Sequence, residues 1–235
     1  MVRIILCGGD EAGRGALLGP LVISLVAAGR GAVGKFSKIG VRDSKLLSRR
    51  RREMLYEAIR DIASEVKVDV ISPQEINDAM KNSISLNELE AIRFARLYDS
   101  VGVDVDTLYL DSPDVIADKF GIRVNMASSK PTRPAGVKQL QKGDGIRYAR
   151  IIAEHKADSK YPVVSAASIV AKVTRDRAMD AISNELGMDL GSGYPSDDVT
   201  IEAVKRNLDS AELLRHIRDR WATMQNIKQT RLASF

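Results

Sequence analysis

Short apolar runs in the first half of the chain have the length and pattern of β-strands. Val2–Gly8 and Leu18–Gly29 are continuously apolar, which predicts strands buried on both faces. Glu65–Ile71 alternates apolar and polar positions with period two, as a half-buried strand does. Two further strands are expected at Asp106–Asp111 and within Ile146–Asp158, and each ends near an acid.

Between these runs, apolar residues three and four positions apart predict helices. Ser48 is expected to cap the first, whose apolar stripe consists of Met54, Leu55, Ala58, Ile59 and Ile62. Ser72 and Ser85 each stand three residues before a glutamate, the pattern of a capping box. Further helices are expected to begin at Ser112 and at Ser165, the second of them long. Because strands and helices alternate, the fold class is α/β with a central, mostly buried sheet.

Composition limits the classes of protein that are possible. With 235 residues, 44% of them hydrophobic, the chain is long enough for one large domain, or for a domain with a smaller appendage. No apolar stretch approaches the ~20 residues that span a bilayer, and no signal peptide is evident. The single cysteine, Cys7, excludes an intrachain disulfide and a cysteine zinc cluster. We therefore expect a cytoplasmic protein, and the net charge of +5 gives only weak support to a polyanionic partner.

Acids follow or end three of the predicted strands: Asp10 with Glu11, then Asp111, then Asp158. In an open α/β sheet ligands gather beyond the strand ends, so these acids are expected to converge on one edge. Clustered carboxylates without cysteine or several histidines favour Mg²⁺ or Mn²⁺. Two such ions about 4 Å apart support in-line displacement at phosphorus. The flanking glycines would allow close packing and close approach of a substrate.

Other kinds of site fit less well. The segment GRGALLG fails the dinucleotide fingerprint, because its third glycine comes one position late, at Gly19. There is no P-loop motif and no G-x-S-x-G elbow, and two histidines are too few for a histidine metal site. The residues alone thus indicate metal-dependent phosphate chemistry. Since neighbouring strand residues point to opposite faces, either the chain bends at Glu11 or Glu11 contributes through its backbone carbonyl.

Five segments in order carry a resemblance to a known family: GGDEAGRGALLGPLV, VRDSKLLS, LYLDSPD, HKADSKYPVVSAASIVAKVTRDR and GSGYPSD. Together they resemble type 2 ribonuclease H, most closely the archaeal form, over residues 4–222. The resemblance implies a ribonuclease H-like fold with a mixed five-stranded sheet flanked by helices. It also implies a catalytic domain at 1–183, a C-terminal helical region at 184–224 and a flexible tail at 225–235.

The same resemblance implies an activity. The enzyme would cut the RNA strand of RNA/DNA hybrids and incise 5′ of single ribonucleotides in duplex DNA, leaving 5′-phosphate and 3′-hydroxyl ends. Four acids would hold two Mg²⁺ or Mn²⁺ ions for this reaction: Asp10, Glu11, Asp111 and Asp158. A type 1 ribonuclease H, a carboxylate exonuclease and a binding module without catalysis are the alternatives.

Several residues are implied to contact the substrate. In the family, the turn Gly13, Arg14 and Gly15 reads the 2′-hydroxyl and the neighbouring phosphate, and Tyr194 stacks under the sugar at the RNA–DNA junction. Lys45 matches a position that holds a phosphate near the cut. Ser165 and Ser168 are expected near a helix start, where free N–H groups suit a phosphate. Lys172 and Arg175 share one helix face, which either contacts the substrate or is solvated.

A basic tract and the C-terminal residues carry two further predictions. The basic tract Ser128–Gly145 is expected to be a loop that contacts the duplex through Lys130, Arg133, Lys138 and Lys142. At the C-terminus, Gln229, Leu232 and Phe235 have the spacing of a sliding-clamp docking motif, against which incidental spacing is the alternative. A monomer is expected.

Overall fold

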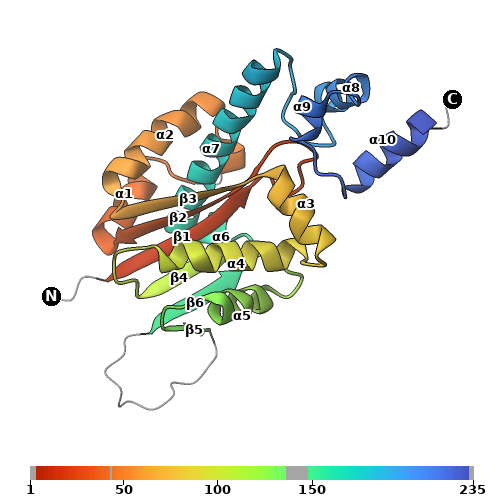
Figure 1. Ribbon diagram of the computed structural model, residues 1–235. Helices are drawn as coiled ribbons and strands as arrows, with labels where there is room; N and C mark the ends of the chain where they lie inside the picture. Colours follow the sequence, from red (N-terminus) through yellow and green to blue (C-terminus); the bar gives the residue numbers. More distant parts are fainter. Residues whose placement is uncertain (1–3, 43, 136–147, 233–235) are drawn as a thin grey trace. The chain divides into compact units, whose positions relative to one another are not determined.

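The computed structural model describes residues 4–42, 44–135 and 148–232 (Figure 1). Its residues form two compact units, each assembled from three segments. Unit 1 comprises the described residues of Met1–Glu11, Ile23–Asp69 and Asn87–Val173. Unit 2 comprises those of Ala12–Val22, Val70–Leu86 and Thr174–Phe235. The segments 12–22 and 70–86 thus group with the C-terminal part, whereas the division at residue 183 stays a prediction.

The strands are β1 (Ile5–Ala12), β2 (Leu21–Gly29), β3 (Glu65–Ile71), β4 (Thr107–Asp111), β5 (Thr132–Pro134) and β6 (Ala149–Glu154). The helices are α1 (Arg30–Lys38), the 3₁₀ turn η1 (Ser44–Leu46), α2 (Arg49–Ile62), α3 (Pro73–Lys81), α4 (Leu86–Asp99), α5 (Ala117–Ala127), α6 (Ala157–Lys160), α7 (Pro162–Leu186), α8 (Asp198–Arg206), α9 (Ala211–Leu214) and α10 (Ala222–Leu232).

Unit 1 contains most of a six-stranded sheet with the order β3-β2-β1-β4-β6-β5. The pairs β1/β4, β4/β6 and β5/β6 are parallel. Gly9 is in register with Leu110, and Asp111 with Glu154. The carboxyl ends of β1, β4 and β6 therefore meet at one edge, and this edge is where the predicted acids lie.

Helices cover both faces of this sheet (Figure 1). On one face α4 and α5 pack on the strands, with the rings of Phe94 and Phe120 edge to face at 5.8 Å. On the other face lie α1, α2 and the first half of α7. A Cβ atom on Gly8 would come within 2.2 Å of the backbone of Val163, so β1 and α7 approach more closely than any side chain allows.

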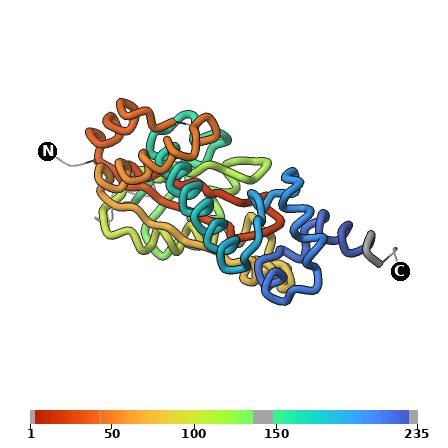
Figure 2. Tube along the Cα trace, turned by 90° about the horizontal axis from the view of Figure 1, so that it is seen from above, coloured from red at the N-terminus to blue at the C-terminus, as the bar shows by residue number. Residues whose placement is uncertain are grey.

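Unit 2 has its own hydrophobic core, formed by Leu17, Leu18, Met179, Ile182, Leu190, Val204, Leu213, Ile217, Met224 and Ile227. Helix α3 is fixed to the C-terminal segment through Asn77, whose amide donates to the carbonyl of Ile217 at 2.9 Å. The backbone N–H of Asp219 donates to the Asn77 side-chain oxygen, also at 2.9 Å. Figure 2 shows α3 beside this C-terminal segment.

Most sequence-based expectations for these elements are confirmed. The fold is α/β with helices on both faces of a central sheet. Ser48 caps α2, and Ser72 with Glu75 forms the capping box of α3. Strand β3 is half-buried, as its alternation predicts.

Several boundaries differ from the predictions. Strand β1 runs through Glu11 to Ala12 instead of ending before the acids, and β5 adds a sixth strand within the tract predicted as loop. The helix expected at Ser112 begins only at Ala117, because the Ser112 hydroxyl caps a turn by donating to the carbonyl of Ala117 and accepting from the N–H of Asp114.

Helical structure also extends further at two places. Helix α7 begins at Pro162, so Ser165 lies inside its first turn and is not its cap. Helix α10 continues to Leu232, where a tail without regular structure was predicted. Across the described ranges, no helix has both the length and the apolar character needed to cross a membrane.

Candidate active site

Two of the predicted acids lie side by side on neighbouring strands. Because β1 and β4 are parallel and Gly9 pairs with Leu110, the next residues in each strand, Asp10 and Asp111, are level with one another. The chain leaves β6 through a left-handed turn at Lys156, with φ +55°, and enters the short helix α6. The N–H of Ala157 then donates to Asp111 Oδ1 at 2.8 Å, which brings α6 and its Asp158 to the same edge.

The charges of these acids influence one another. Burial raises the pKa of Asp10 well above its usual value, and the charges of Glu11 and Asp111 raise it further. Burial also raises the pKa of Asp111, to which the charge of Asp158 adds. These interactions link all four acids, and they show that negative charge is costly at this edge of unit 1.

Glu11 follows Asp10 in the same strand, and its exposure differs. Asp10 is buried and Glu11 is half-buried, as expected for neighbours on opposite faces of a strand. The N–H of Glu11 donates to Asp10 Oδ1 at 2.8 Å, so the Glu11 backbone itself helps to fix the Asp10 carboxylate. How Glu11 takes part in the reaction stays a prediction.

A chain of hydroxyl groups leads from Asp10 to the segment that carries Lys45. Ser168 on α7 donates a hydrogen bond to Asp10, which lowers the pKa of that carboxyl against the effect of burial. The hydroxyls of Ser168 and Ser44 are 2.9 Å apart and hydrogen-bonded. Lys45 follows in η1, is exposed, and lowers the pKa of Asp111 by its charge. The role of Ser44 was not predicted, because residues 124 positions apart carry no local signal of contact.

The donor set suits a hard divalent cation in chemistry and in charge. Carboxylate oxygens are the ligands that Mg²⁺ and Mn²⁺ prefer, and a cation would relieve the repulsion that raises the pKa values. Within the part of the chain that the structure describes, however, no three histidine, cysteine, aspartate or glutamate side chains are arranged to hold a metal ion. The acids therefore form a suitable donor set that is not arranged as a finished metal cage.

Unit 2 contains the Gly-Arg-Gly turn and Tyr194, the predicted substrate contacts. Gly13 has φ +91°, and a Cβ on it would lie 2.3 Å from Nε of Arg175. Gly193 has φ +80°, and its carbonyl accepts from the N–H groups of Leu17 and Leu18 at 2.8 and 3.1 Å. Arg14 and Tyr194 are half-buried and Gly15 is exposed. The turn and the loop before Tyr194 are therefore fixed to each other by their backbones.

Two fully buried arginines complete this arrangement. The guanidinium of Arg175 lies 4.7 Å from the ring centre of Tyr194 and donates to the carbonyl of Ser192 at 2.8 Å. Burial lowers the pKa of Arg175. Arg218 donates to the carbonyls of Arg14 and Gly19 at 2.9 and 3.0 Å. Arg175 is thus not on the solvated helix face that its spacing suggested, and Arg218 had no sequence signal at all.

The remaining predicted site residues are Ser165, the C-terminal motif and the basic tract. Ser165 is buried, and its hydroxyl donates to the carbonyls of Asp158 and Tyr161. It fixes α6 to α7, and this contact replaces the helix-cap role predicted for it. Gln229 is exposed on α10, whereas the side chain of Leu232 and all of Phe235 lie outside the described residues. Lys138 and Lys142 of the basic tract also lie outside them.

Comparisons with known proteins assign the chain to a family. A family model described as Ribonuclease HII matches residues 7–224. A Ribonuclease HII of Thermofilum pendens is 40% identical over 231 residues, which cover 95% of this chain and 99% of the relative.

Solved structures give the same result. The crystal structure of ribonuclease H2 from Pyrococcus horikoshii is 35% identical with a TM-score of 0.79, covering 97% of this chain and 98% of the other. The RNase HII chain in the PCNA:RNase HII complex from Archaeoglobus fulgidus is also 35% identical, with a TM-score of 0.76, covering 93% and 95%. Because the family model matches most of the sequence and the fold agrees over nearly its whole length, this chain belongs to the ribonuclease HII family.

Proposed function

We propose that this ribonuclease incises duplex DNA on the 5′ side of a single embedded ribonucleotide and leaves 5′-phosphate and 3′-hydroxyl ends. Membership of the family gives ribonuclease H activity on RNA/DNA hybrids. The proposal adds that Asp10, Glu11, Asp111 and Asp158 are the catalytic acids. The observation that carries it is that Asp10 and Asp111, each one residue beyond the paired Gly9 and Leu110, lie level at a shared strand edge, with pKa values raised by burial and by neighbouring acids.

Enzymes of this family depend on divalent metal ions, and we propose that these four acids hold Mg²⁺ or Mn²⁺. Such ions, when bound, activate water and stabilise charge on the phosphate during displacement. The protein's own contribution is to position the carboxylates. The N–H groups of Glu11 and Ala157 fix Asp10 and Asp111, and Ser168 donates to Asp10. Lys45 supplies a positive charge near Asp111, where it would hold a substrate phosphate.

Selection of a ribonucleotide is assigned to unit 2. The 2′-hydroxyl distinguishes RNA from DNA, and the backbone of Gly13, Arg14 and Gly15 is proposed to contact it. Tyr194 is proposed to stack under the sugar at the RNA–DNA junction. Support comes from the way Arg175 and Arg218 fix these groups, since a preorganised turn loses little entropy on binding.

The decisive experiment uses a DNA duplex with one ribonucleotide, tested with Mg²⁺, with Mn²⁺ and with a chelator. We expect a single cut 5′ of the ribonucleotide with either metal and none with the chelator. Asp10→Asn and Asp158→Asn should bind the duplex but not cut it. Asp61→Asn, which changes an exposed acid on α2, is the matched control and should cut normally. An uncut duplex would refute incision at single ribonucleotides, and normal cleavage by Asp10→Asn would refute the site.

We also propose a sliding clamp as a partner of the C-terminus. An RNase HII of Archaeoglobus fulgidus was solved in a complex with PCNA, and the end of this chain has the spacing Gln229, Leu232, Phe235. Truncation after Lys228 should abolish binding to the clamp and leave cleavage of a short hybrid unchanged. Retained clamp binding by the truncated enzyme would assign the contact to another surface.

A further inference from the structure

Positive charge is concentrated in one short segment of the chain. Residues 30–52 contain nine lysines and arginines and one acid, a net charge of +8. Since the whole chain carries +5, the remaining residues together carry −3. The basic character of the protein therefore comes entirely from α1, η1 and the start of α2.

Most of these charges face solvent. The exposed ones are Arg30, Lys35, Lys38, Arg42, Lys45, Arg49, Arg50 and Arg51. The remaining one, Arg52, donates to the carbonyl of Leu47 at 2.7 Å, and Arg51 donates to that of Ile39. These two bonds hold the connection between the helices against the first turn of α2. We call the exposed cations of Lys38, Arg42, Lys45, Arg49 and Arg50 the basic surface.

The basic surface includes charges that disfavour the helix on which they lie. Helix α2 begins with four consecutive arginines and has no acid in its first turn. The amino end of a helix carries partial positive charge, so each cation there is unfavourable by about 0.3–1 kcal/mol. A group with negative charge bound at this place would remove that repulsion, as phosphates do at helix amino ends.

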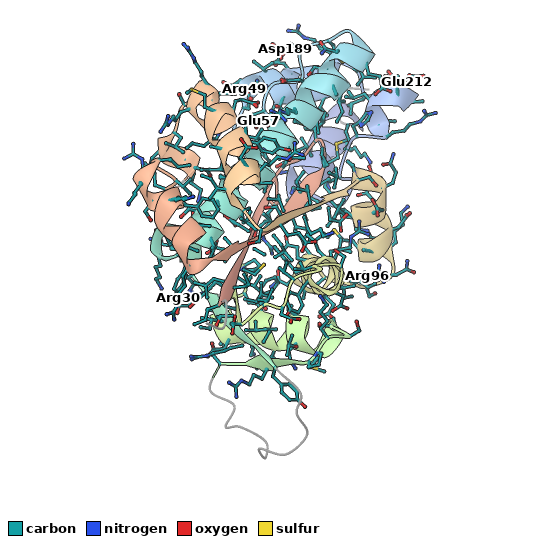
Figure 3. The ribbon with its side chains drawn as sticks, turned by 90° about the vertical axis from the view of Figure 1, so that its left-hand side faces the viewer. Arg30, Arg49, Glu57, Arg96, Asp189 and Glu212 are labelled. Carbon is teal, nitrogen blue, oxygen red and sulfur yellow. The ribbon has the colours of Figure 1, made fainter. Side chains whose placement is uncertain are left out.

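The basic surface is continuous with the candidate active site. Ser44, next to Lys45, is hydrogen-bonded to Ser168, which donates to Asp10. From that point the surface extends over the end of α1 and the start of α2. Figure 3 shows Arg49 and Arg30 on these two helices and Arg96 on α4, which packs on the opposite face of the sheet. Because Lys45 joins this surface to the acids, we expect the phosphates that flank a cleaved position to meet it.

We propose that the basic surface binds the phosphate backbone of the duplex flanking the cleaved position, independently of base sequence. The inference rests on the proposed function, because it takes the four acids as the place of cleavage. Lys45 begins this surface at the active site. The more distant Arg42 and Arg50 are exposed and form no ion pair with any residue in the described ranges.

The test compares two double variants that remove the same charge. Arg42→Gln/Arg50→Gln changes the basic surface, whereas Arg96→Gln/Lys119→Gln removes two exposed cations from α4 and α5. Binding to a 24-base-pair RNA/DNA hybrid is measured with a chelator present, so that no cleavage occurs, between 50 and 200 mM salt. Thermal unfolding of both proteins confirms that they are folded.

Each lost phosphate contact should reduce the slope of log K against log salt by about 0.9. The variant that lacks two cations of the basic surface should bind more weakly than the wild type at 50 mM salt. Its loss of affinity between 50 and 200 mM should be smaller than that of the wild type by a factor of about 12. The α4/α5 variant should match the wild type. Equal slopes for all three proteins would overturn the proposal, and so would an equal reduction in both variants, which would reflect net charge alone. Because binding is measured without cleavage, failure of this proposal is distinguishable from failure of the assigned catalytic site.

Discussion

Arg175→Lys tests whether a buried arginine prepares Tyr194 for its proposed contact with the sugar. The substitution keeps a positive charge but removes the planar guanidinium that lies 4.7 Å from the ring centre of Tyr194. A desolvated cation–π contact contributes about 2 kcal/mol, and a hydrogen bond from a charged donor about 1.5–3 kcal/mol. Lysine cannot reach the ring and the carbonyl of Ser192 with one rigid group, so we expect it to retain only one of the two contacts.

The readout is kcat/KM on the one-ribonucleotide duplex, measured in a double-mutant cycle with Tyr194→Ala. If Arg175 acts through Tyr194, Arg175→Lys should lower kcat/KM by about 5- to 30-fold, corresponding to about 1–2 kcal/mol. In the Tyr194→Ala background the same substitution should change kcat/KM very little. A purely structural role predicts the same loss in both backgrounds, together with a parallel loss of thermal stability.

Arg218→Lys is the matched control for this cycle. Arg218 is also fully buried in unit 2, but its guanidinium lies 5.1 Å from the ring centre of Trp221 and donates to the carbonyls of Arg14 and Gly19. Its effect on kcat/KM should therefore be independent of Tyr194→Ala. If Arg175→Lys proves as independent of Tyr194 as the control, the positioning role assigned to Arg175 is refuted.

Three other outcomes are expected. Gly8→Ala should destabilise the protein by about 3 kcal/mol, because its Cβ would overlap the backbone of α7. Gly34→Ala is the control and should leave stability unchanged, because no atom lies within 4 Å of the added Cβ; calorimetry measures both variants. Because burial raises the pKa of Asp10, the folded state binds its proton more tightly than the unfolded state. The stability of the folded state should therefore fall as pH rises from the ordinary carboxyl pKa towards the raised one. At pH 7.5 in a chelator, Asp10→Asn should unfold at a higher temperature than the wild type, and Mg²⁺ should reduce this difference in unfolding temperature. A difference that Mg²⁺ leaves unchanged would argue against metal binding at Asp10. Cys7 is fully buried and its pKa is raised by burial, so iodoacetamide should label it only at the rate of unfolding.

Local chemistry made much of the fold predictable. The capping box at Ser72 needs only residues within one turn, and the alternation in β3 reflects its own exposure. The meeting of Asp10 with Asp111 was also predictable, because strand ends in a parallel sheet share an edge. These features are predictable because the residues that form the sequence pattern are the same residues that form the structural feature.

What the sequence did not reveal depends on packing between distant segments. Arginine is normally solvated, so an exposed face was one of the two alternatives for Arg175. Its burial depends on contacts with Leu18, Ser192 and Tyr194, which are distant in sequence or lie in another segment. The hydrogen bond of Ser44 to Ser168 joins segments 124 residues apart. At Ser112, a serine that looks like a helix cap instead closes a turn, and α5 begins five residues later, at Ala117. Tertiary contacts determine these features, and a local sequence pattern does not predict such contacts.

Two unfavourable charge arrangements in unit 1 indicate where its ligands bind. At the strand edge, Asp10 and Asp111 have raised pKa values because carboxylates are crowded and buried there. At the start of α2, four arginines stand at the positive end of a helix. Arg51 and Arg52 donate hydrogen bonds to the carbonyls of Ile39 and Leu47, whereas the crowded carboxylates and the exposed charge of Arg50 add electrostatic repulsion to the free domain. On the proposed function, a divalent cation would relieve the first and a phosphate backbone would relieve the second, so one substrate complex would stabilise both. The destabilised places in the free protein would then be the places where binding free energy is gained.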